Sequence, residues 1–221
     1  FKVIKIDNKK IDIHKEKLKK PVILILCSVH GNEPAGFYAC KNIRSYIKNK
    51  KINGTIFFYS NPNPYGLKYE SRYQKTDNLR LKDINRNFQN EGLGPVSKKI
   101  VNYSKISDLI IDLHEGWGYH IQNQDSIGST VMTTSNKNTE FIGKQLVKHI
   151  NNHIKDENKK FVFIKQKNHK KENSLSSWCE KNNKNYILIE TTGQNDIQPL
   201  DLRIKQQELL INKILKLKKV Y

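Results

Sequence analysis

The sequence predicts an α/β fold, a three-layer αβα sandwich in which a central mixed, mostly parallel sheet lies between two layers of helices. Three observations favour this fold class. Apolar runs without polar alternation are typical of strands that are covered on both faces. Segments with helical periodicity separate these runs, as in repeated strand–helix units. The chain of 221 residues also suffices for a full core, and no linker is evident, so we expect a single domain over residues 1–221.

Strands are predicted where apolar or β-branched residues run together between turn signals. The predicted strands cover residues 1–4, 11–13, 22–27, 55–59, 109–113, 130–134, 161–164 and 186–189. The first two are short and neighbouring, which indicates a hairpin at one edge of the sheet. The four runs that begin at Val22, Thr55, Leu109 and Tyr186 are almost wholly apolar, so we expect them to form the buried centre of the sheet.

Helices are predicted where apolar residues recur at spacings of three and four. The predicted helices cover residues 34–50, 96–103, 138–153 and 175–181, and a last one begins near residue 199. Proline lies in the first turn of the first and last of these, where its fixed φ suits a helix start. Between residues 61 and 94 little is periodic, and a loop of that length inside a compact domain is usually functional.

The chain is strongly basic, with 40 Lys and Arg against 21 Asp and Glu and a net charge of +19. Such an excess attracts polyanions, but the lysines are scattered and no nucleic-acid-binding motif accompanies them. We therefore favour a lysine-rich solvated surface and expect no specific nucleic-acid partner. No apolar run approaches the roughly 18 residues of a membrane span. A cytoplasmic location is favoured, with a periplasmic or secreted one expected if a signal peptide preceded Phe1.

The three cysteines, Cys27, Cys40 and Cys179, are far apart in the sequence and form no CxxC pair. Cys27 lies in a predicted buried strand and Cys40 in a predicted helix, so we expect buried thiols. An odd and sparse set is not typical of a disulfide framework.

Four potentially reactive side chains come directly after predicted buried strands. They are His30 and Glu33, then His114, then Glu190. Ligands of parallel sheets bind beyond the carboxyl ends of the strands, and two imidazoles with one carboxylate suit a catalytic zinc that keeps one position open. Glu190 is then placed to act as a general base. The alternative is that these residues are surface or capping groups, with Glu33 complementing a helix N-terminus, and the pattern alone leaves both open.

Other catalytic patterns are weaker. His149 and His153 are four apart on a predicted helix, but the glutamate that follows the first histidine in zinc peptidases of the HExxH type is missing. The sequence also has no G-x-S-x-G elbow, no P-loop and no dinucleotide glycine fingerprint. The strand-end residues therefore carry the functional hypothesis.

Four motifs in chain order resemble those of zinc carboxypeptidases of the carboxypeptidase A type, a family that includes murein peptide amidases and the succinylglutamate desuccinylase/aspartoacylase branch. The motifs are His30-Gly31-Asn32-Glu33, Asp83-Ile84-Asn85-Arg86-Asn87-Phe88, Asp112-Leu113-His114 and Ile187-Leu188-Ile189-Glu190. The resemblance implies one zinc ion held by His30, Glu33 and His114, with Glu190 as the catalytic base. It also implies the same three-layer sandwich fold.

The resemblance also implies roles for residues of the long loop between residues 61 and 94. Asn85 and Arg86 would hold a substrate carboxylate, for which a planar guanidinium is well suited. Asp83 would bond the second nitrogen of the first histidine ligand. Arg80 would polarise the scissile carbonyl, with Arg72 as the alternative for that role, and plain solvation remains open for both arginines.

The expected substrate is a small peptide or N-acyl amino acid with a free carboxylate. Segment 173–179, NSLSSWC, resembles a stretch of murein peptide amidases, which cleave the γ-D-glutamyl–diaminopimelate bond, and this favours a metallocarboxypeptidase or amidase that acts on peptidoglycan-derived peptides. The alternatives are an N-acyl amino acid deacylase and, more remotely, a non-catalytic polyanion-binding domain. Tyr65, Tyr73 and Tyr119 are candidates for the tyrosine that digestive carboxypeptidases place near the scissile bond.

Overall fold

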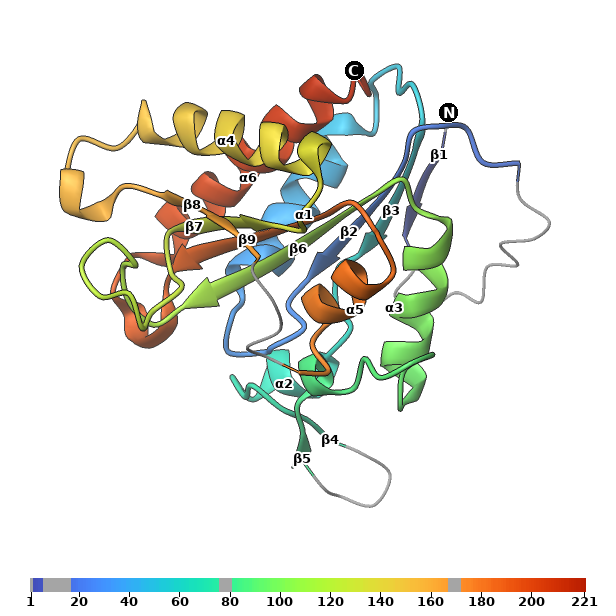
Figure 1. Ribbon diagram of the computed structural model, residues 1–221, viewed down its shortest axis with the longest axis horizontal. Helices are drawn as coiled ribbons and strands as arrows, with labels where there is room; N and C mark the ends of the chain where they lie inside the picture. Colours follow the sequence, from blue (N-terminus) through green and yellow to red (C-terminus); the bar gives the residue numbers. More distant parts are fainter. Residues whose placement is uncertain (1, 6–16, 76–80, 167–171) are drawn as a thin grey trace.

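Figure 1 shows the computed structural model, which describes residues 2–5, 17–75, 81–166 and 172–221. Its main element is a seven-stranded sheet with the strand order β1-β3-β2-β6-β9-β7-β8. These strands are β1 (Lys2–Lys5), β2 (Val22–Cys27), β3 (Thr55–Tyr59), β6 (Leu109–Gly116), β7 (Thr130–Thr133), β8 (Val162–Lys165) and β9 (Tyr186–Thr192). Every neighbouring pair is parallel except β7 and β9, which are antiparallel. The predicted mixed, mostly parallel sheet is therefore confirmed.

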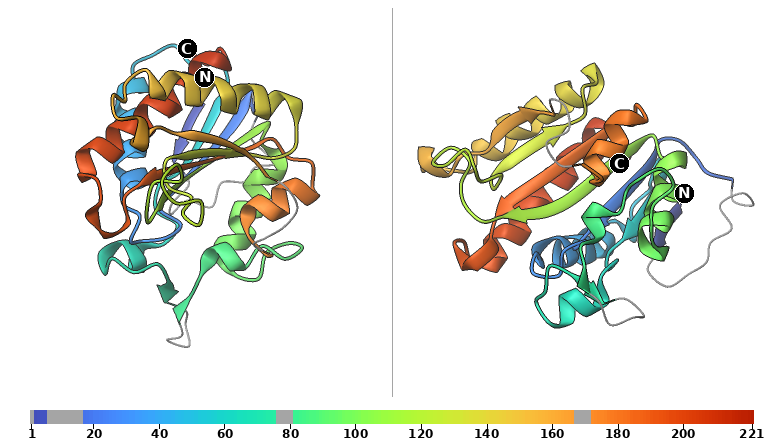
Figure 2. Two further views of the ribbon diagram at one scale, coloured as in Figure 1. Left: turned by 60° about the vertical axis from the view of Figure 1, so that its left-hand side comes forward. Right: turned by 60° about the horizontal axis from the view of Figure 1, so that its bottom comes forward.

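Helices cover both faces of this sheet (Figures 1 and 2). One layer contains α1 (Ala35–Ile47), α4 (Lys137–Asn151) and α6 (Leu200–Leu217), and the opposite layer contains α3 (Pro95–Ile106) and α5 (Leu175–Lys181). The long loop holds α2 (Pro64–Lys68), the small pair β4 (Gln74–Lys75) and β5 (Leu81–Lys82), and a 3-10 turn, Ile84–Arg86. Together these layers confirm the predicted α/β sandwich.

The central strand β2 shows why its sequence does not alternate between apolar and polar residues. Ile23, Ile25 and Cys27 belong to the hydrophobic cluster beneath α1, α4 and α6. The intervening residues, Val22, Leu24 and Leu26, belong to the cluster on the other face. All six are at most 2% exposed, and burial of each large aliphatic side chain stabilises the fold by about 1.5–3 kcal/mol.

Several predicted boundaries differ from the observed ones. Residues 2–5 form an edge strand that is parallel to β3, while the expected hairpin partner at 11–13 lies outside the described residues. β6 continues three residues beyond Leu113 and β9 three residues beyond Ile189. The reason is that the two strands pair with each other as far as Gly116 and Thr192. His114 and Glu190 thus lie within strands rather than after them.

The expectation of buried thiols is wrong for two of the three cysteines. Cys27 and Cys40 form a disulfide whose Cα atoms are 6.9 Å apart, and Cys179 is free and buried. Cys27 is the last residue of β2, and Cys40 lies on the buried face of the helix that packs over this strand. The contact is tertiary, so the spacing of the cysteines in the sequence does not indicate it.

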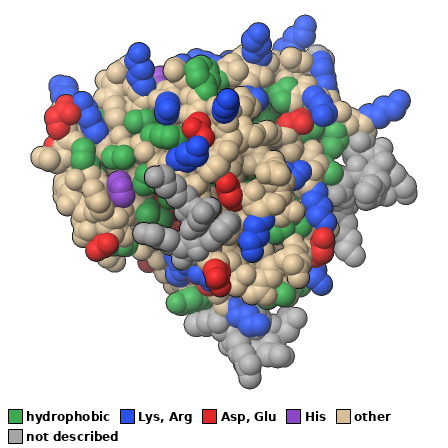
Figure 3. All heavy atoms as spheres, in the orientation of Figure 1, with side chains coloured by type: hydrophobic (Ala, Val, Ile, Leu, Met, Phe, Trp, Pro, Cys, Tyr) green, Lys and Arg blue, Asp and Glu red, His purple; other side chains and the backbone are tan. Residues whose placement is uncertain are grey.

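One face of the molecule can be compared with the expectation of scattered charge. On the face drawn in Figure 3, Lys and Arg side chains are spread over the whole outline and are interspersed with acidic ones. Within the described part of the chain, no helix has the length and apolar character that a membrane crossing requires.

Candidate metal centre and catalytic cavity

The turn after β2 places the first two candidate ligands. Ser28 has a φ of 51°, which turns the chain out of the sheet, and its hydroxyl accepts the N–H of Phe37 at 3.1 Å. Gly31 then passes directly against α2, because a Cβ on this residue would lie 1.8 Å from the carbonyl carbon of Gly66. This close approach requires glycine, and it brings His30 and Glu33 together above the end of β2.

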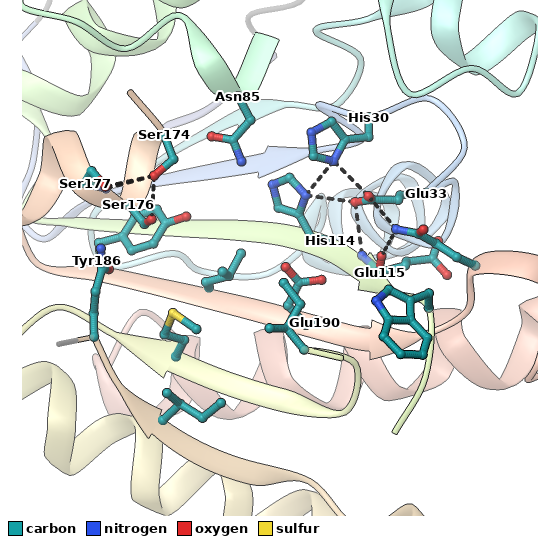
Figure 4. Close-up of a pocket in the computed structure, with 18 of the residues that line it drawn as sticks. His30, Glu33, Asn85, His114, Glu115, Ser174, Ser176, Ser177, Tyr186 and Glu190 are labelled. Atoms are coloured by element: carbon teal, nitrogen blue, oxygen red, sulfur yellow. Dashed lines mark hydrogen bonds and ion pairs between the residues drawn. The ribbon is translucent and has the colours of Figure 1, made fainter. Parts of the chain in front are cut away.

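The three predicted metal ligands converge (Figure 4). Nδ1 of His30 lies 2.8 Å from Oε1 of Glu33, and Nδ1 of His114 lies 2.8 Å from Oε2 of the same carboxylate. The two Nδ1 atoms are 3.1 Å apart. All three side chains are buried, and their ligand atoms lie within 4.8 Å of one another. Two imidazole nitrogens and a carboxylate that face one point form a possible cation site.

The outer nitrogen of each histidine faces an aspartate. Nε2 of His30 lies 3.2 Å from Asp83, and Nε2 of His114 lies 3.1 Å from Asp112. Asp112 also accepts the hydroxyl of Tyr186 at 2.8 Å. A carboxylate on the outer nitrogen favours the tautomer that presents the inner nitrogen as a lone pair, as is usual for histidines that bind metals. The donor set therefore fits a divalent cation such as zinc.

The close approach of these groups shifts their pKa values. Burial alone would raise the pKa of Glu33, but the neighbouring His30 and His114 outweigh it and hold this pKa far below its usual range. Burial likewise opposes ionisation of Asp83, yet the hydrogen bond and charge of His30, together with Arg72, lower its pKa. For His114, burial would lower the pKa, whereas the adjacent carboxylates of Asp112 and Glu33 raise it well above the usual value.

Glu190 lies beside this cluster because of strand register. It is the partner of His114 on the adjacent parallel strand, so both side chains project from the same face of the sheet. Its side chain is only 4% exposed, and in Figure 4 its carboxylate points into the cavity. The structure thus brings the predicted base next to the predicted ligands.

A cavity of about 570 Å³ opens over the cluster and contains Arg72, Asn85, Arg86 and Glu190 in its wall. Asn85 is half-buried and accepts the N–H of Leu175 at 2.9 Å, while Arg86 is exposed. Arg72 bonds Asp83 through Nε at 3.0 Å, and its Nη1 lies 3.3 Å from Nδ1 of His30. Arg80, the first choice for polarising the carbonyl, lies outside the described residues.

Residues 19–120 match the family model of the succinylglutamate desuccinylase/aspartoacylase catalytic domain. This match includes the first three of the four sequence motifs and confirms the predicted resemblance, whereas Glu190 lies beyond it. No curated protein matches the sequence.

Solved structures share the fold. Csd4 from Helicobacter pylori, a D,L-carboxypeptidase in its mDAP-bound form, has a TM-score of 0.74 at 17% identity, over 91% of this chain and 51% of Csd4. Tripeptide-bound Csd4 gives the same TM-score and identity, over 91% and 52%. A candidate metallopeptidase from Shewanella denitrificans has a TM-score of 0.65 at 14% identity, over 94% and 78%. The chain spans about half the length of Csd4. At these identities the likeness shows the fold alone.

Some cavity residues differ from those expected. Ser174, Ser176 and Ser177 from segment 173–179 line the cavity, but Trp178 is 4% exposed in the core, where its Nε1 donates to the carbonyl of Asn90 at 2.7 Å. Among the described tyrosines, Tyr186 alone lines the cavity, so the candidates Tyr65, Tyr73 and Tyr119 do not. Tyr186 is the first residue of a predicted strand. The sequence does not indicate that its hydroxyl bonds Asp112 on β6, so it gave no reason to place this tyrosine in the cavity.

Sequence reasoning also missed Gln194 and Glu115, which both line the cavity. Glu115 directly follows a predicted ligand, and Gln194 follows the predicted base by four residues. Their closeness in sequence to the motifs is the only signal, and other residues next to the motifs share it.

Proposed function

We propose that this chain is a zinc-dependent hydrolase that cleaves an amide bond next to a substrate carboxylate. The observation that carries the proposal is the convergence of His30, Glu33 and His114 in one cavity with Glu190, Asn85 and Arg86 in its wall. A metal site alone would also fit a structural role, but structural zinc sites are closed by four protein ligands. Three ligands beside a buried carboxylate and an open cavity favour catalysis.

The side chains divide into three roles. Bound zinc would polarise the scissile carbonyl and lower the pKa of water towards about 7. Glu190 takes a proton from the attacking water and passes it to the leaving nitrogen. Arg72 lies beside the histidine–glutamate cluster and supplies positive charge where the carbonyl oxygen becomes negative. The role of Arg72 is proposed because its Nη1 lies 3.3 Å from Nδ1 of His30 and 3.5 Å from Oε1 of Glu33.

Asn85 and Arg86 hold the substrate carboxylate and so determine which bond reaches Glu190. The guanidinium binds two carboxylate oxygens through parallel N–H groups. Asn85 keeps its side-chain oxygen occupied by the N–H of Leu175, which directs the amide NH2 away from that contact and leaves it available as a donor. This arrangement favours substrates with a carboxylate next to the scissile amide.

We further propose that the substrate is a peptidoglycan-derived peptide and the scissile bond γ-D-glutamyl–diaminopimelate. Support comes from the cavity position of Ser174, Ser176 and Ser177 and from the fold shared with Csd4, whose mDAP-bound and tripeptide-bound forms are known. The second candidate is an N-acyl amino acid deacylase, which the matched succinylglutamate desuccinylase/aspartoacylase family favours.

The deciding experiment incubates the zinc-loaded protein with three substrate sets and identifies products by mass. The sets are muropeptide tripeptides, ordinary peptides with a free C-terminus, and N-succinyl or N-acetyl amino acids. Release of diaminopimelate supports the peptidoglycan proposal, and release of a free amino acid from the third set alone supports the deacylase. Absence of zinc from the purified protein after loading and desalting would overturn both.

A further inference from the structure

The carboxylate of Glu33 is held by donors that are not metal ligands. Its Oε2 accepts the backbone N–H of Glu115 at 3.1 Å, and its Oε1 accepts Nε2 of Gln194 at 3.1 Å. Besides the two histidines, and Arg72 Nη1 at 3.5 Å from Oε1, each oxygen therefore accepts one further hydrogen bond. Two donors on opposite oxygens fix the rotation of the carboxylate plane, which decides where a metal-binding lone pair points.

Gln194 is itself fixed at a second point. The same amide nitrogen lies 2.6 Å from the backbone carbonyl of Glu115 and donates to it. The side chain thus spans the gap between the turn after β9 and the end of β6, and it lines the catalytic cavity. Gln194 belongs to the turn that follows β9, the strand of the proposed base Glu190. This one segment therefore carries the carboxylate of Glu190 and hydrogen-bonds the carboxylate of Glu33.

The turn that carries Gln194 has an unusual backbone. Asn195 and Asp196 follow each other with φ of 62° and 54°, a left-handed conformation that Asn and Asp adopt more readily than most residues but that is uncommon in succession. Gly193 precedes them, and a Cβ on it would lie 2.0 Å from a carboxylate oxygen of Glu115 and 2.3 Å from Arg203. Such a turn persists only where surrounding contacts hold it in place.

A buried ion pair supplies those contacts. Arg203, from α6, is 3% exposed and donates to Glu115 Oε2 at 2.5 Å, to the carbonyl of Gly193 at 3.0 Å and to Asp196 at 3.1 Å. The other oxygen of Glu115 accepts the N–H of Ala35 at 2.7 Å, at the start of α1. The pair therefore links α6, β6 and α1 to the turn around Gln194.

From these contacts we infer that Gln194 is a positioning residue of the metal centre, held by the Arg203–Glu115 pair, and that it fixes Glu33 for metal binding. The inference rests on the proposed metal centre, but not on the identity of the substrate. Gln194 takes no part in bond cleavage. Its loss is expected to weaken metal binding rather than to prevent folding.

The test compares Gln194→Met with Gln198→Met. Gln198 is a control because it lies in the same segment and donates Nε2 to a backbone carbonyl, that of Thr192, at 2.8 Å. It is 4% exposed and so more buried than the half-buried Gln194, which makes it the more demanding site for folding. It has no contact with Glu33 among those described. Zinc affinity is measured by competition with a chromophoric chelator, and the thermal melting of each zinc-free protein reports folding. Gln194→Ala repeats the measurement without adding bulk.

We expect Gln194→Met and Gln194→Ala to bind zinc about 10–100-fold more weakly than the wild type, as is typical for loss of a group that orients a metal ligand. Gln198→Met should stay within about twofold. Wild-type affinity in both Gln194 variants, or equal weakening in Gln198→Met, would overturn the inference while leaving the metal centre intact. Failure of the wild-type protein to bind zinc would overturn the metal centre and the inference with it.

Discussion

Replacement of Gly31 by alanine tests how closely the turn that carries the proposed ligands His30 and Glu33 packs against α2. An alanine Cβ would lie 1.8 Å from the carbonyl carbon of Gly66 and 2.3 Å from the nitrogen of Leu67, where ordinary contacts begin at 3.4 Å. The obstacle is backbone, so no side-chain rotation relieves it. The hydrogen bond from Gly31 N–H to the carbonyl of Ser71, 2.9 Å long, would have to stretch as the two segments move apart.

Overpacking of this kind costs about 1–3 kcal/mol, and the involvement of backbone on both sides places Gly31→Ala near 3 kcal/mol. For a chain of this length that corresponds to a fall in Tm of about 6–12 °C. Zinc affinity should fall as well, since metal–ligand distances tolerate only about 0.2 Å and both His30 and Glu33 flank the displaced residue.

The assay is thermal unfolding by circular dichroism, with and without a chelator, together with zinc competition. Gly94→Ala is the control, because a Cβ there meets only Ser97 Oγ, at 3.8 Å. Gly94 also precedes a helix start, so we expect a loss below about 1 kcal/mol. A Gly31→Ala protein with the Tm and zinc affinity of the wild type would refute the steric argument.

Four further predictions follow from the site and the core. Glu190→Gln should lower kcat by about 10²–10⁴-fold with zinc still bound, and unchanged turnover would remove the base assignment. Arg86→Lys should raise KM on the order of tenfold for a carboxylate substrate but not for its amide, since an ammonium lacks the bidentate fork. Zinc at 100 times its Kd should stabilise the protein by about 2.7 kcal/mol, seen as a rise in Tm that a chelator reverses. Cys27→Ala with Cys40→Ala should cost about 3 kcal/mol in urea unfolding, from the 13-residue separation, and alkylation of the unreduced, denatured wild type should label Cys179 alone.

The sequence predicts a structural feature correctly where one short segment alone determines that feature. The bounds of β2, β3 and α5 were predicted without error, because a continuous apolar run or a helical repeat is local information. The rule that parallel strands present ligands at their carboxyl ends also predicts that His30, Glu33, His114 and Glu190 lie close together. These two sources predict the fold class, and the motif resemblance adds the roles of the residues in the proposed centre.

The sequence does not predict contacts between segments that are far apart in the chain. Gln194 and Glu33 are separated by 161 residues and Arg203 and Glu115 by 88, and nothing in the composition of either segment indicates the partner. The same holds for the Cys27–Cys40 disulfide, which depends on how α1 packs over β2. The order of the strands and the packing of the helices set these contacts, whereas periodicity predicts that an element forms without predicting which residues it contacts.

Strand β6 explains how the centre is joined to the rest of the fold. Alternate residues of a strand project to opposite faces, so the side chains of Asp112 and His114 project from one face of β6, while the side chain of Glu115 projects from the other, towards α1 and α6. The backbone N–H of Glu115 nevertheless bonds Glu33. One strand therefore provides a proposed metal ligand on one face and the carboxylate of the buried ion pair on the other. A substitution in α6 near Arg203 is therefore expected to shift the proposed metal site through Glu115 and Gln194, without altering any proposed ligand.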